Sequence, residues 1–254
     1  MLRSAALAFP RGGEGVWFFL GAATALSVRR LLVSRLQVRV KSSGATVGDV
    51  HDPFLSASPR KKSGLYTRTG DKGTSSLYNG ERRAKTDAVF EALGHQDELC
   101  CALGIAREHC AASENGLDGY LVEVQSRLFD LGAAVATPIA GSSEEKRNYT
   151  ALDPKLTDQV EEWIDALDAT LPPLSNFVIP SGGLSCTHLN LARAVCRRAE
   201  RAIVPLVRAQ QVDAEVGRYL NRLADFLFAA SRAAALRENK TEILWKKKKA
   251  STDK

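Results

Sequence analysis

The sequence predicts an all-α protein, an antiparallel five-helix bundle that follows a disordered N-terminal leader. From about residue 65 onward, apolar residues recur at intervals of three and four, which is the helical period. Short breaks rich in proline and glycine separate these helical stretches, and the sequence predicts no strand-rich region. A chain of 254 residues, 44% apolar and 25% charged, fits one globular domain plus a tail.

Residues 1–62 differ from the rest of the chain in charge. They carry ten Lys/Arg and three Asp/Glu, a net charge of +7, whereas the whole chain carries +6, so the remainder is about −1. Arginine-rich, acid-poor segments that contain serine are typical of transit peptides. The apolar run Val16–Val28 has 13 residues, whereas a membrane-spanning helix needs about 20. We therefore interpret residues 1–62 as a mitochondrial transit peptide with a linker, and expect a matrix protein without a membrane span.

Two other interpretations of the leader stay open, a secretory signal and a disordered cytosolic tail. A signal would use Val16–Ala25 as its apolar core, but that run starts late and arginines continue beyond it. The folded domain is expected over 63–245, with a basic disordered tail over 246–254. Because the folded part is close to neutral, net charge does not support nucleic-acid binding.

The first two predicted helices follow from their caps and apolar spacing. Thr86 or Asp87 can cap a helix that runs to about His109. Its expected inner face is Val89, Leu93, Gln96, Cys100 and Leu103. The second helix ends at Thr137-Pro138 and carries a heptad-like seam of Leu117, Leu121, Val124, Leu128, Leu131 and Val135.

Three more helices complete the prediction. Asp153-Pro154 places an N-cap before a first-turn proline, and Leu171-Pro172-Pro173 stops the helix that follows. A fourth helix is expected over about 185–209, where Pro205 should force a kink or an early end. The fifth covers about 213–237, with Val216, Leu220, Leu223, Leu227, Ala230 and Ala234 inward.

A polar segment near the start of the folded part suits a phosphate ligand. Residues 67–77 combine hydroxyls, two glycines, two cations and one acid. Glycines let the backbone approach a ligand, and successive N–H groups, hydroxyls and a lysine fit polyphosphate oxygens. The alternative is an ordinary solvated loop. Neither a Walker-type loop nor a G-x-G-x-x-G turn is present, which excludes those nucleotide sites.

The fourth predicted helix has an arginine-rich face. Asn190, Arg193, Arg197, Glu200 and Arg201 fall on one side at 100° per residue, with Leu191, Val195 and Ala202 opposite. Stacked guanidinium groups repel each other unless an anion faces them. The face is therefore either a solvated surface, worth little energetically, or a clamp that binds a triphosphate bidentately.

Two weaker polar clusters accompany that face. On the fifth helix, Asn221, Asp225, Phe228 and Arg232 lie away from the leucine seam and suit a subunit contact or a catalytic pair. On the first helix, a carboxylate of Asp97-Glu98 could pair with an arginine of the fourth helix, or could simply be a surface acid. Five cysteines lack C-x-x-C spacing, so no metal site is expected and the thiols should be small buried groups.

Four motifs in this order resemble one enzyme family, the trimeric, helix-bundle ATP:cob(I)alamin adenosyltransferases, with the mitochondrial animal members most similar. The motifs are Tyr66–Gly73 with Gly80–Lys85, Phe90–Leu99, Phe177–Gly183, and Arg193–Arg201 with Asn221–Asp225. The resemblance extends from about Leu65 to Trp245. It departs from the family pattern at Gly94-His95-Gln96 and at Cys100-Cys101, close to Asp97.

The resemblance implies transfer of the 5′-deoxyadenosyl group of ATP to the cobalt of cob(I)alamin, giving adenosylcobalamin and triphosphate. It implies a homotrimer with active sites between subunits, assistance by Mg²⁺, and possible delivery of product to an adenosylcobalamin-dependent mutase. It places Phe177 beneath the corrin and an Asp97–Arg193 salt bridge across a subunit contact. ATP would be bound by Thr67, Arg68, Thr69, Gly70, Ser75, Ser76, Lys85, Arg197, Arg198, Ala199, Glu200, Arg201 and Asn221.

Two functions of other classes compete with this interpretation. A helical nucleic-acid-binding protein could use the same arginines on phosphates, but a near-neutral domain without interleaved aromatic residues disfavours it. A non-catalytic helical adaptor would not need the polar segment at 67–76, so ATP binding distinguishes it from the enzyme.

Overall fold

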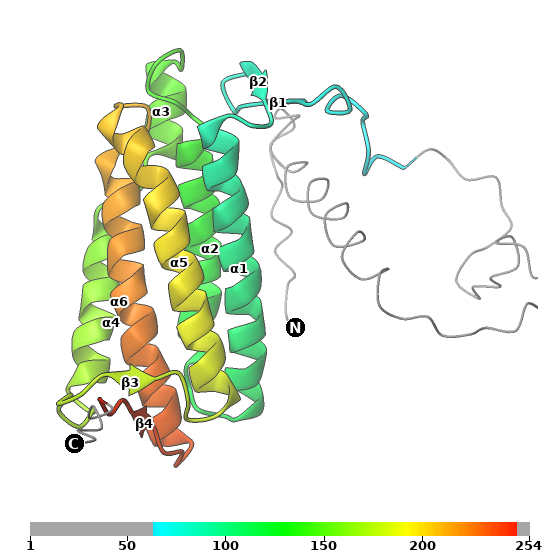
Figure 1. Cartoon of the computed structure of the whole chain (residues 1–254). Coiled ribbons are helices and arrows are strands. Elements are labelled where there is room, and N and C mark those ends of the chain that lie inside the picture. The colour runs from blue at the N-terminus through cyan, green and yellow to red at the C-terminus, as the bar shows by residue number, and fades with distance from the viewer. Residues whose placement is uncertain (1–62, 248–254) are drawn as a thin grey trace, which may run out of the picture. The chain divides into compact units, whose positions relative to one another are not determined.

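The computed structural model describes residues 63–247, and the chain divides into two compact units, Met1–Lys72 and Gly73–Lys254, each described by itself. The predicted leader and most of the predicted tail lie outside the described residues. In the second unit, five long helices lie side by side (Figure 1). They are α1 (Ala88–Ala112), α2 (Asp118–Val135), α4 (Lys155–Asp168), α5 (Leu184–Arg208) and α6 (Ala214–Arg237).

Consecutive long helices alternate in direction, as predicted (Figure 1). α5 packs against both α1 and α6, α1 packs against α2, and α4 packs against α6. The α4–α6 pair is parallel, because the chain reverses twice between these two helices, once before and once after α5. The polar contacts show this direction, since Thr157 contacts Glu215 and, further along both helices, Glu161 contacts Arg222.

The predicted caps fix where the helices begin. The Asp87 carboxylate accepts from the Val89 N–H at 2.9 Å, and the Asp153 carboxylate accepts from the Lys155 N–H at 3.0 Å. Asp213 accepts from the Glu215 N–H at 2.8 Å at the start of α6. Each bond satisfies a backbone donor that has no partner within its helix.

The leucine seams of α2 and α6 form the centre of the core, as predicted, and all of their named members are buried. On α1 the buried stripe includes Ala92, Leu99 and Ala106, whereas Leu93 and Cys100 pack at its edge. Gln96 is 8% exposed and donates to the Leu128 carbonyl at 2.6 Å. Gly132 makes room for that amide, because a Cβ there would lie 2.6 Å from Gln96 Oε1.

The structure adds elements that the helical period does not reveal. α3 (Glu144–Thr150) begins at Ser143, whose hydroxyl accepts from the Lys146 N–H at 3.3 Å. β1 (Thr74–Ser76) pairs with β2 (Arg82–Ala84) as an antiparallel hairpin. β3 (Val178–Ile179) pairs with β4 (Ile243–Leu244), which joins the expected extended piece to the chain after α6.

α5 continues past Pro205 to Arg208, close to the expected end at about residue 209, so the alternative of an early end at Pro205 is wrong. Pro205 is exposed and lies in the last turn, so the one lost backbone bond leaves a carbonyl that water can reach. Of the residues expected opposite the arginine row on α5, Val195 is buried at 5% exposure, whereas Leu191 is 50% exposed. Among the described residues, no helix is both long and apolar enough to cross a membrane.

Candidate functional site

The arginine row on α5 lies on the flank and outer surface of that helix. Leu189, Cys196 and Ile203 point into the core, which leaves the arginines at the surface. Arg197 and Arg201 are exposed, and Arg201 Nη1 donates to the Arg197 carbonyl at 3.1 Å. At 1.5 Å per residue, Arg193 and Arg201 are about 12 Å apart along the axis, a span that suits an extended triphosphate.

The α6 side of this row is defined by two contacts. The Arg193 guanidinium lies 5.1 Å from the centre of the Phe228 ring. Asn221 Nδ2 donates to Glu200 Oε1 at 2.9 Å, so the acid of the row is bound to α6. The predicted stripe of α6 therefore meets the predicted stripe of α5. Ala199 lies differently from the other predicted residues, because its side chain is buried in the core.

The α1 side of α5 carries the expected carboxylate–arginine pair. Glu98 binds Arg198, which confirms that an acid of the 97–98 pair meets an arginine of this helix. Arg198 therefore points toward α1, away from Asn221. Asp97 is half-buried, and burial raises the pKa of its carboxyl above the usual range. The Asp97–Arg193 pair expected across a subunit contact stays a prediction.

The β1–β2 hairpin holds the predicted residues Ser75, Ser76 and Lys85, and lies at the end of the bundle where α5 finishes (Figure 1). Ser75 and Ser76 are half-buried, whereas Lys85 is exposed and its N–H donates to the Gly73 carbonyl at 2.8 Å. Gly73 has φ +78°, a conformation that favours glycine. The hairpin thus gathers hydroxyl and ammonium groups within a few residues.

Arg82 is a hairpin residue that the list of expected ligands did not include. Its Nη2 donates to Thr74 Oγ1 at 2.7 Å and its Nη1 to Ser76 Oγ at 3.0 Å. It lies in the Gly80–Lys85 motif, but its role could not be seen without the strand register that sets Ser76 opposite Arg82. Arg82 organises the hydroxyls of the hairpin.

Residues 63–72 belong to the first compact unit and carry four further predicted ligands. The hydroxyls of Thr67 and Thr69 are hydrogen-bonded at 3.0 Å, and both residues are exposed. Arg68 has φ +60°, and its guanidinium lies 5.5 Å from the centre of the Tyr66 ring. Gly70 completes this set of adjacent polar groups.

Phe177 lies at the other end of the bundle, next to β3. Its side chain is 79% exposed, and its ring meets Trp245 edge-on with centroids 6.3 Å apart. The Trp245 N–H donates to the Phe177 carbonyl at 2.8 Å. The Phe177 and Trp245 rings therefore give the β3–β4 ribbon an apolar surface.

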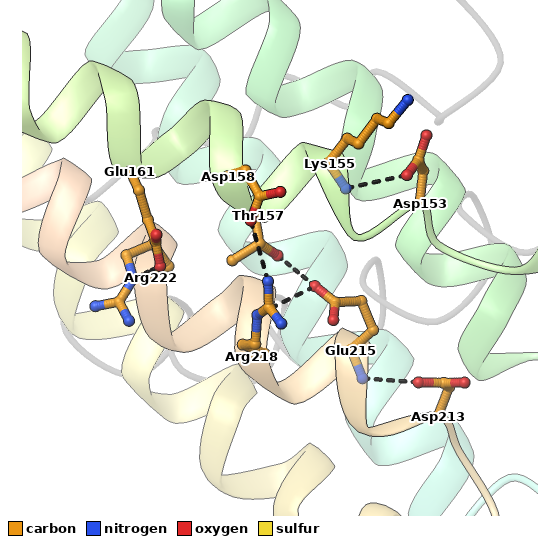
Figure 2. A network of polar contacts seen from close by, with 9 residues as sticks. All are labelled: Asp153, Lys155, Thr157, Asp158, Glu161, Asp213, Glu215, Arg218 and Arg222. Atoms are coloured by element: carbon orange, nitrogen blue, oxygen red, sulfur yellow. Dashed lines mark hydrogen bonds and ion pairs between the residues drawn. The ribbon is translucent and has the colours of Figure 1, made fainter.

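A second arginine-bearing face lies between α4 and α6. Figure 2 shows Arg218 between Asp158 and Glu215, with nitrogen–oxygen distances of 3.2 and 3.6 Å. Arg222 contacts Glu161 at 2.9 Å and Asp225 at 3.1 Å. Each guanidinium here is neutralised by acids of the same chain, which is typical of a structural face.

The cysteines do not take part in this site as nucleophiles. Cys110, Cys186 and Cys196 are buried, as expected, but Cys101 is exposed and Cys100 half-buried. Burial raises the pKa of Cys186 to about 11 and also raises the pKa of Cys196, which keeps both thiols protonated at neutral pH.

Comparisons with known proteins agree with this arrangement. The family profile described as cobalamin adenosyltransferase matches residues 65–234. Corrinoid adenosyltransferase MMAB of Mus musculus is 44% identical over 235 residues, 91% of this chain and 98% of the relative. The corrinoid adenosyltransferase of Mycobacterium leprae is 38% identical over 186 residues, 72% of this chain and 95% of the relative.

Solved structures show the same likeness. A variant of the PduO-type ATP:corrinoid adenosyltransferase from Lactobacillus reuteri, complexed with cobalamin and ATP, has a TM-score of 0.67 at 32% identity and covers 72% of this chain and 99% of its own. Another variant, complexed with ATP, has a TM-score of 0.65 at 33% identity, covering 71% and 99%. The chain belongs to the cobalamin adenosyltransferase family.

Proposed function

We propose that this protein transfers the 5′-deoxyadenosyl group of ATP to the cobalt of cob(I)alamin, giving adenosylcobalamin and triphosphate. The observation that carries the proposal is the row of Arg193, Arg197 and Arg201 on α5. Within residues 63–247, the contacts of these guanidinium groups are an aromatic ring and a backbone carbonyl rather than carboxylates. A row of this kind suits a polyanion supplied from outside the chain.

The chemistry needs position and charge more than a reactive side chain. An electron pair of Co(I) forms the bond to C5′ while the C5′–O bond breaks, and triphosphate leaves with the electron pair of the C5′–O bond. Arg197 and Arg201 stabilise the charge that develops on the leaving group. The protein thus supplies orientation and field, while the corrinoid substrate supplies the nucleophile.

Mg²⁺ is expected to accompany the triphosphate, and the residues present fit it. Magnesium prefers oxygen ligands, and Glu200 and Asn221 provide a carboxylate and an amide oxygen beside the arginine row. When bound, the ion would neutralise phosphate charge. Glu200 is held toward α6 by its 2.9 Å bond from Asn221, which keeps the carboxylate on the same flank as Arg193.

The corrin is proposed to lie over Phe177. An apolar ring beneath cobalt offers no lone pair, so it displaces the lower ligand and favours a four-coordinate Co(II), which is easier to reduce. The exposure of Phe177, at 79%, leaves its face accessible to a large planar ligand. Arg193, about one turn N-terminal to the centre of α5, is then the arginine of the row nearest to the Phe177 end of the helix.

A homotrimer with active sites between subunits is part of the same proposal, and the length of the bundle supports sites that subunits share. The β1–β2 hairpin and β3, which directly follows Phe177, lie at opposite ends of α5, which has 25 residues and is about 37 Å long. One ATP cannot span that distance to reach cobalt. We therefore propose that the hairpin of one subunit serves the Phe177 of another, with Asp97 and Arg193 paired across the contact.

The cell context belongs to the same proposal. We infer a transit peptide and linker over 1–62, an enzyme domain over 63–245 and a basic tail over 246–254, with function in the mitochondrial matrix. An adenosylcobalamin-dependent mutase is the proposed recipient of the product.

The direct test mixes purified protein, ATP, Mg²⁺ and chemically reduced cobalamin and follows the absorbance of the cobalt–carbon product. We expect adenosylcobalamin and triphosphate in equal amounts. Tight ATP binding without product would reduce the protein to a binding module. Salt-dependent DNA binding in place of ATP binding would support the nucleic-acid alternative.

A further inference from the structure

Arg232, on α6, is buried, with 6% exposure. Among residues 63–247 it is the only charged residue that is buried. A buried charge costs several kcal/mol unless it is paired and hydrogen-bonded. Arg232 Nη2 donates to the Pro172 carbonyl at 2.9 Å, and Nε lies 3.5 Å from Glu242 Oε2. One guanidinium therefore binds two segments of chain that are far apart in sequence.

Those two segments are the ones that build the ribbon beneath the proposed corrin site. Pro172 lies before β3, and Glu242 immediately precedes β4. The ribbon is small, with two paired residues on each side, Val178 with Leu244 and Ile179 with Ile243. A two-stranded ribbon of this size is not stable alone in water. It needs attachment to the bundle.

The Arg232 contacts provide that attachment at the entry to both strands. Within the ribbon, the Ser181 hydroxyl links the two strands, since it donates to the Ile179 carbonyl at 2.7 Å and accepts from the Ile243 N–H at 2.8 Å. Gly182 lies against α6, where an added Cβ would come 2.8 Å from the Ala235 Cβ. The ribbon is thus fixed to α6 at both ends.

Phe177 depends on this attachment more than a core residue would. Its side chain is mostly exposed and is not held by surrounding core packing. Its place is set by its backbone, which is bound to Trp245, and by the ring of Trp245. We propose that Arg232, with Glu242, is a positioning residue that holds the ribbon so that Phe177 sits at a fixed height beneath the corrin. This inference rests on the proposed function.

The geometry calls for arginine at this position. The planar fork of a guanidinium can bind a carbonyl and a carboxylate at once, whereas a lysine ammonium is a compact point charge. Arg232→Lys keeps the charge and should hold only one of the two segments. Arg232→Met keeps the apolar stem and removes both contacts. Glu242→Gln weakens one contact and leaves the carbonyl contact intact.

The experiment compares these three variants with Arg218→Met, a control on the same helix that removes a surface ion pair at the α4–α6 face. Hydrogen exchange of the full-length protein is followed by mass spectrometry. We expect faster exchange in peptides covering 172–180 and 241–246 for Arg232→Met, less for the milder variants, and unchanged exchange in α1 and α2. The control should match the wild type in the ribbon.

The second readout separates positioning from general damage. Turnover is measured from cob(II)alamin with a reductant and from fully reduced cob(I)alamin. We expect Arg232→Met to lose roughly tenfold in the first assay and less in the second, with KM for ATP within about twofold of wild type. The spectrum of bound Co(II) should show less of the four-coordinate form, and Arg232→Lys should recover part of it.

Unchanged ribbon exchange in Arg232→Met would overturn the attachment. A loosened ribbon with a normal Co(II) spectrum and normal turnover would overturn the positioning role. If Arg232→Met does not fold, Glu242→Gln decides both points, because it alters a carboxylate that is 18% exposed. A wild-type protein that forms no product refutes the proposed function and the positioning role with it, while hydrogen exchange still decides the attachment.

Discussion

Two arginine-bearing faces of the same bundle differ in what surrounds their guanidinium groups. On the α4–α6 face, Arg218 contacts Asp158 and Glu215, and Arg222 contacts Glu161 (Figure 2). Arg222 also contacts Asp225. On α5, the described contacts of Arg193 and Arg201 are the Phe228 ring and a backbone carbonyl. A face with balanced charges adds modestly to stability, whereas an unbalanced row repels itself until an anion binds. Arginine content alone therefore does not identify a binding site, but the partners of the arginines do.

The strongest test of this comparison is Arg197→Ala. Losing a cation that faces the leaving group should cost about 2–4 kcal/mol in kcat/KM for ATP. Arg218→Ala is the matched control, and it should keep normal kcat/KM per folded molecule. Steady-state kinetics of both variants decides between them. An Arg197→Ala enzyme with unchanged kcat/KM would remove Arg197 from the role.

On the α4–α6 face, we expect Glu215→Ala to lower the stability of the fold rather than kcat/KM. Glu215 is the acceptor for the hydroxyl of Thr157, which is 0% exposed, and it also contacts Arg218. Leaving that hydroxyl without its partner should reduce the free energy of unfolding by about 1–3 kcal/mol. Urea unfolding measures this loss. Arg197→Ala, by contrast, should change stability by less than about 0.5 kcal/mol, as is usual for an exposed side chain.

Phe177→Ala sharpens the comparison by separating the corrin end from the phosphate row. Turnover from cob(II)alamin should fall roughly tenfold or more, about 1.4 kcal/mol, because cobalt regains a lower ligand. KM for ATP should change little, since the arginines are intact. Spectra of bound Co(II) provide the check, and a four-coordinate signal that survives the substitution would contradict the assignment.

The smallest effect is expected at Asp97. On α1, the neighbouring acids Glu98 and Asp97 can be compared in the same way as the two arginine-bearing faces. Glu98 has a cation partner in Arg198, whereas burial raises the pKa of Asp97. A raised pKa favours the protonated form in the folded state, so the stability of a single subunit should fall as pH rises through that pKa. The change should be under about 1 kcal/mol, because the half-exposed group is screened by water.

Asp97→Asn should remove this dependence of stability on pH. Thermal denaturation from about pH 4 to pH 7 tests it, at protein concentrations below and above subunit assembly. If Arg193 of a neighbouring subunit faces Asp97, assembly should lower the pKa and reverse the sign, so that stability rises with pH. A pH profile of the variant that matches the wild type at both concentrations would make Asp97 a surface acid.

The regular part of the fold could be predicted because helices repeat. The seam from Leu117 to Val135 buries every member, and Asp153-Pro154 marks the start of α4 as expected. α3 was missed because it has no apolar period, although Ser143 followed by two glutamates is a recognisable first turn. The β1–β2 hairpin was missed because strands of three residues, Thr-Ser-Ser and Arg-Arg-Ala, give no apolar alternation to detect.

The sequence by itself determined the bundle, its caps and the grouping of arginines on one helix, because each depends on residues within a few turns of one another. The tertiary structure decided which neighbour each charge meets. Glu98 rather than Asp97 pairs with α5, Glu200 turns to Asn221, and Arg232 joins Pro172 to Glu242. Such pairings depend on how packed helices are rotated and offset relative to one another. Core packing sets this rotation and offset, so a local pattern of residues cannot predict the pairings.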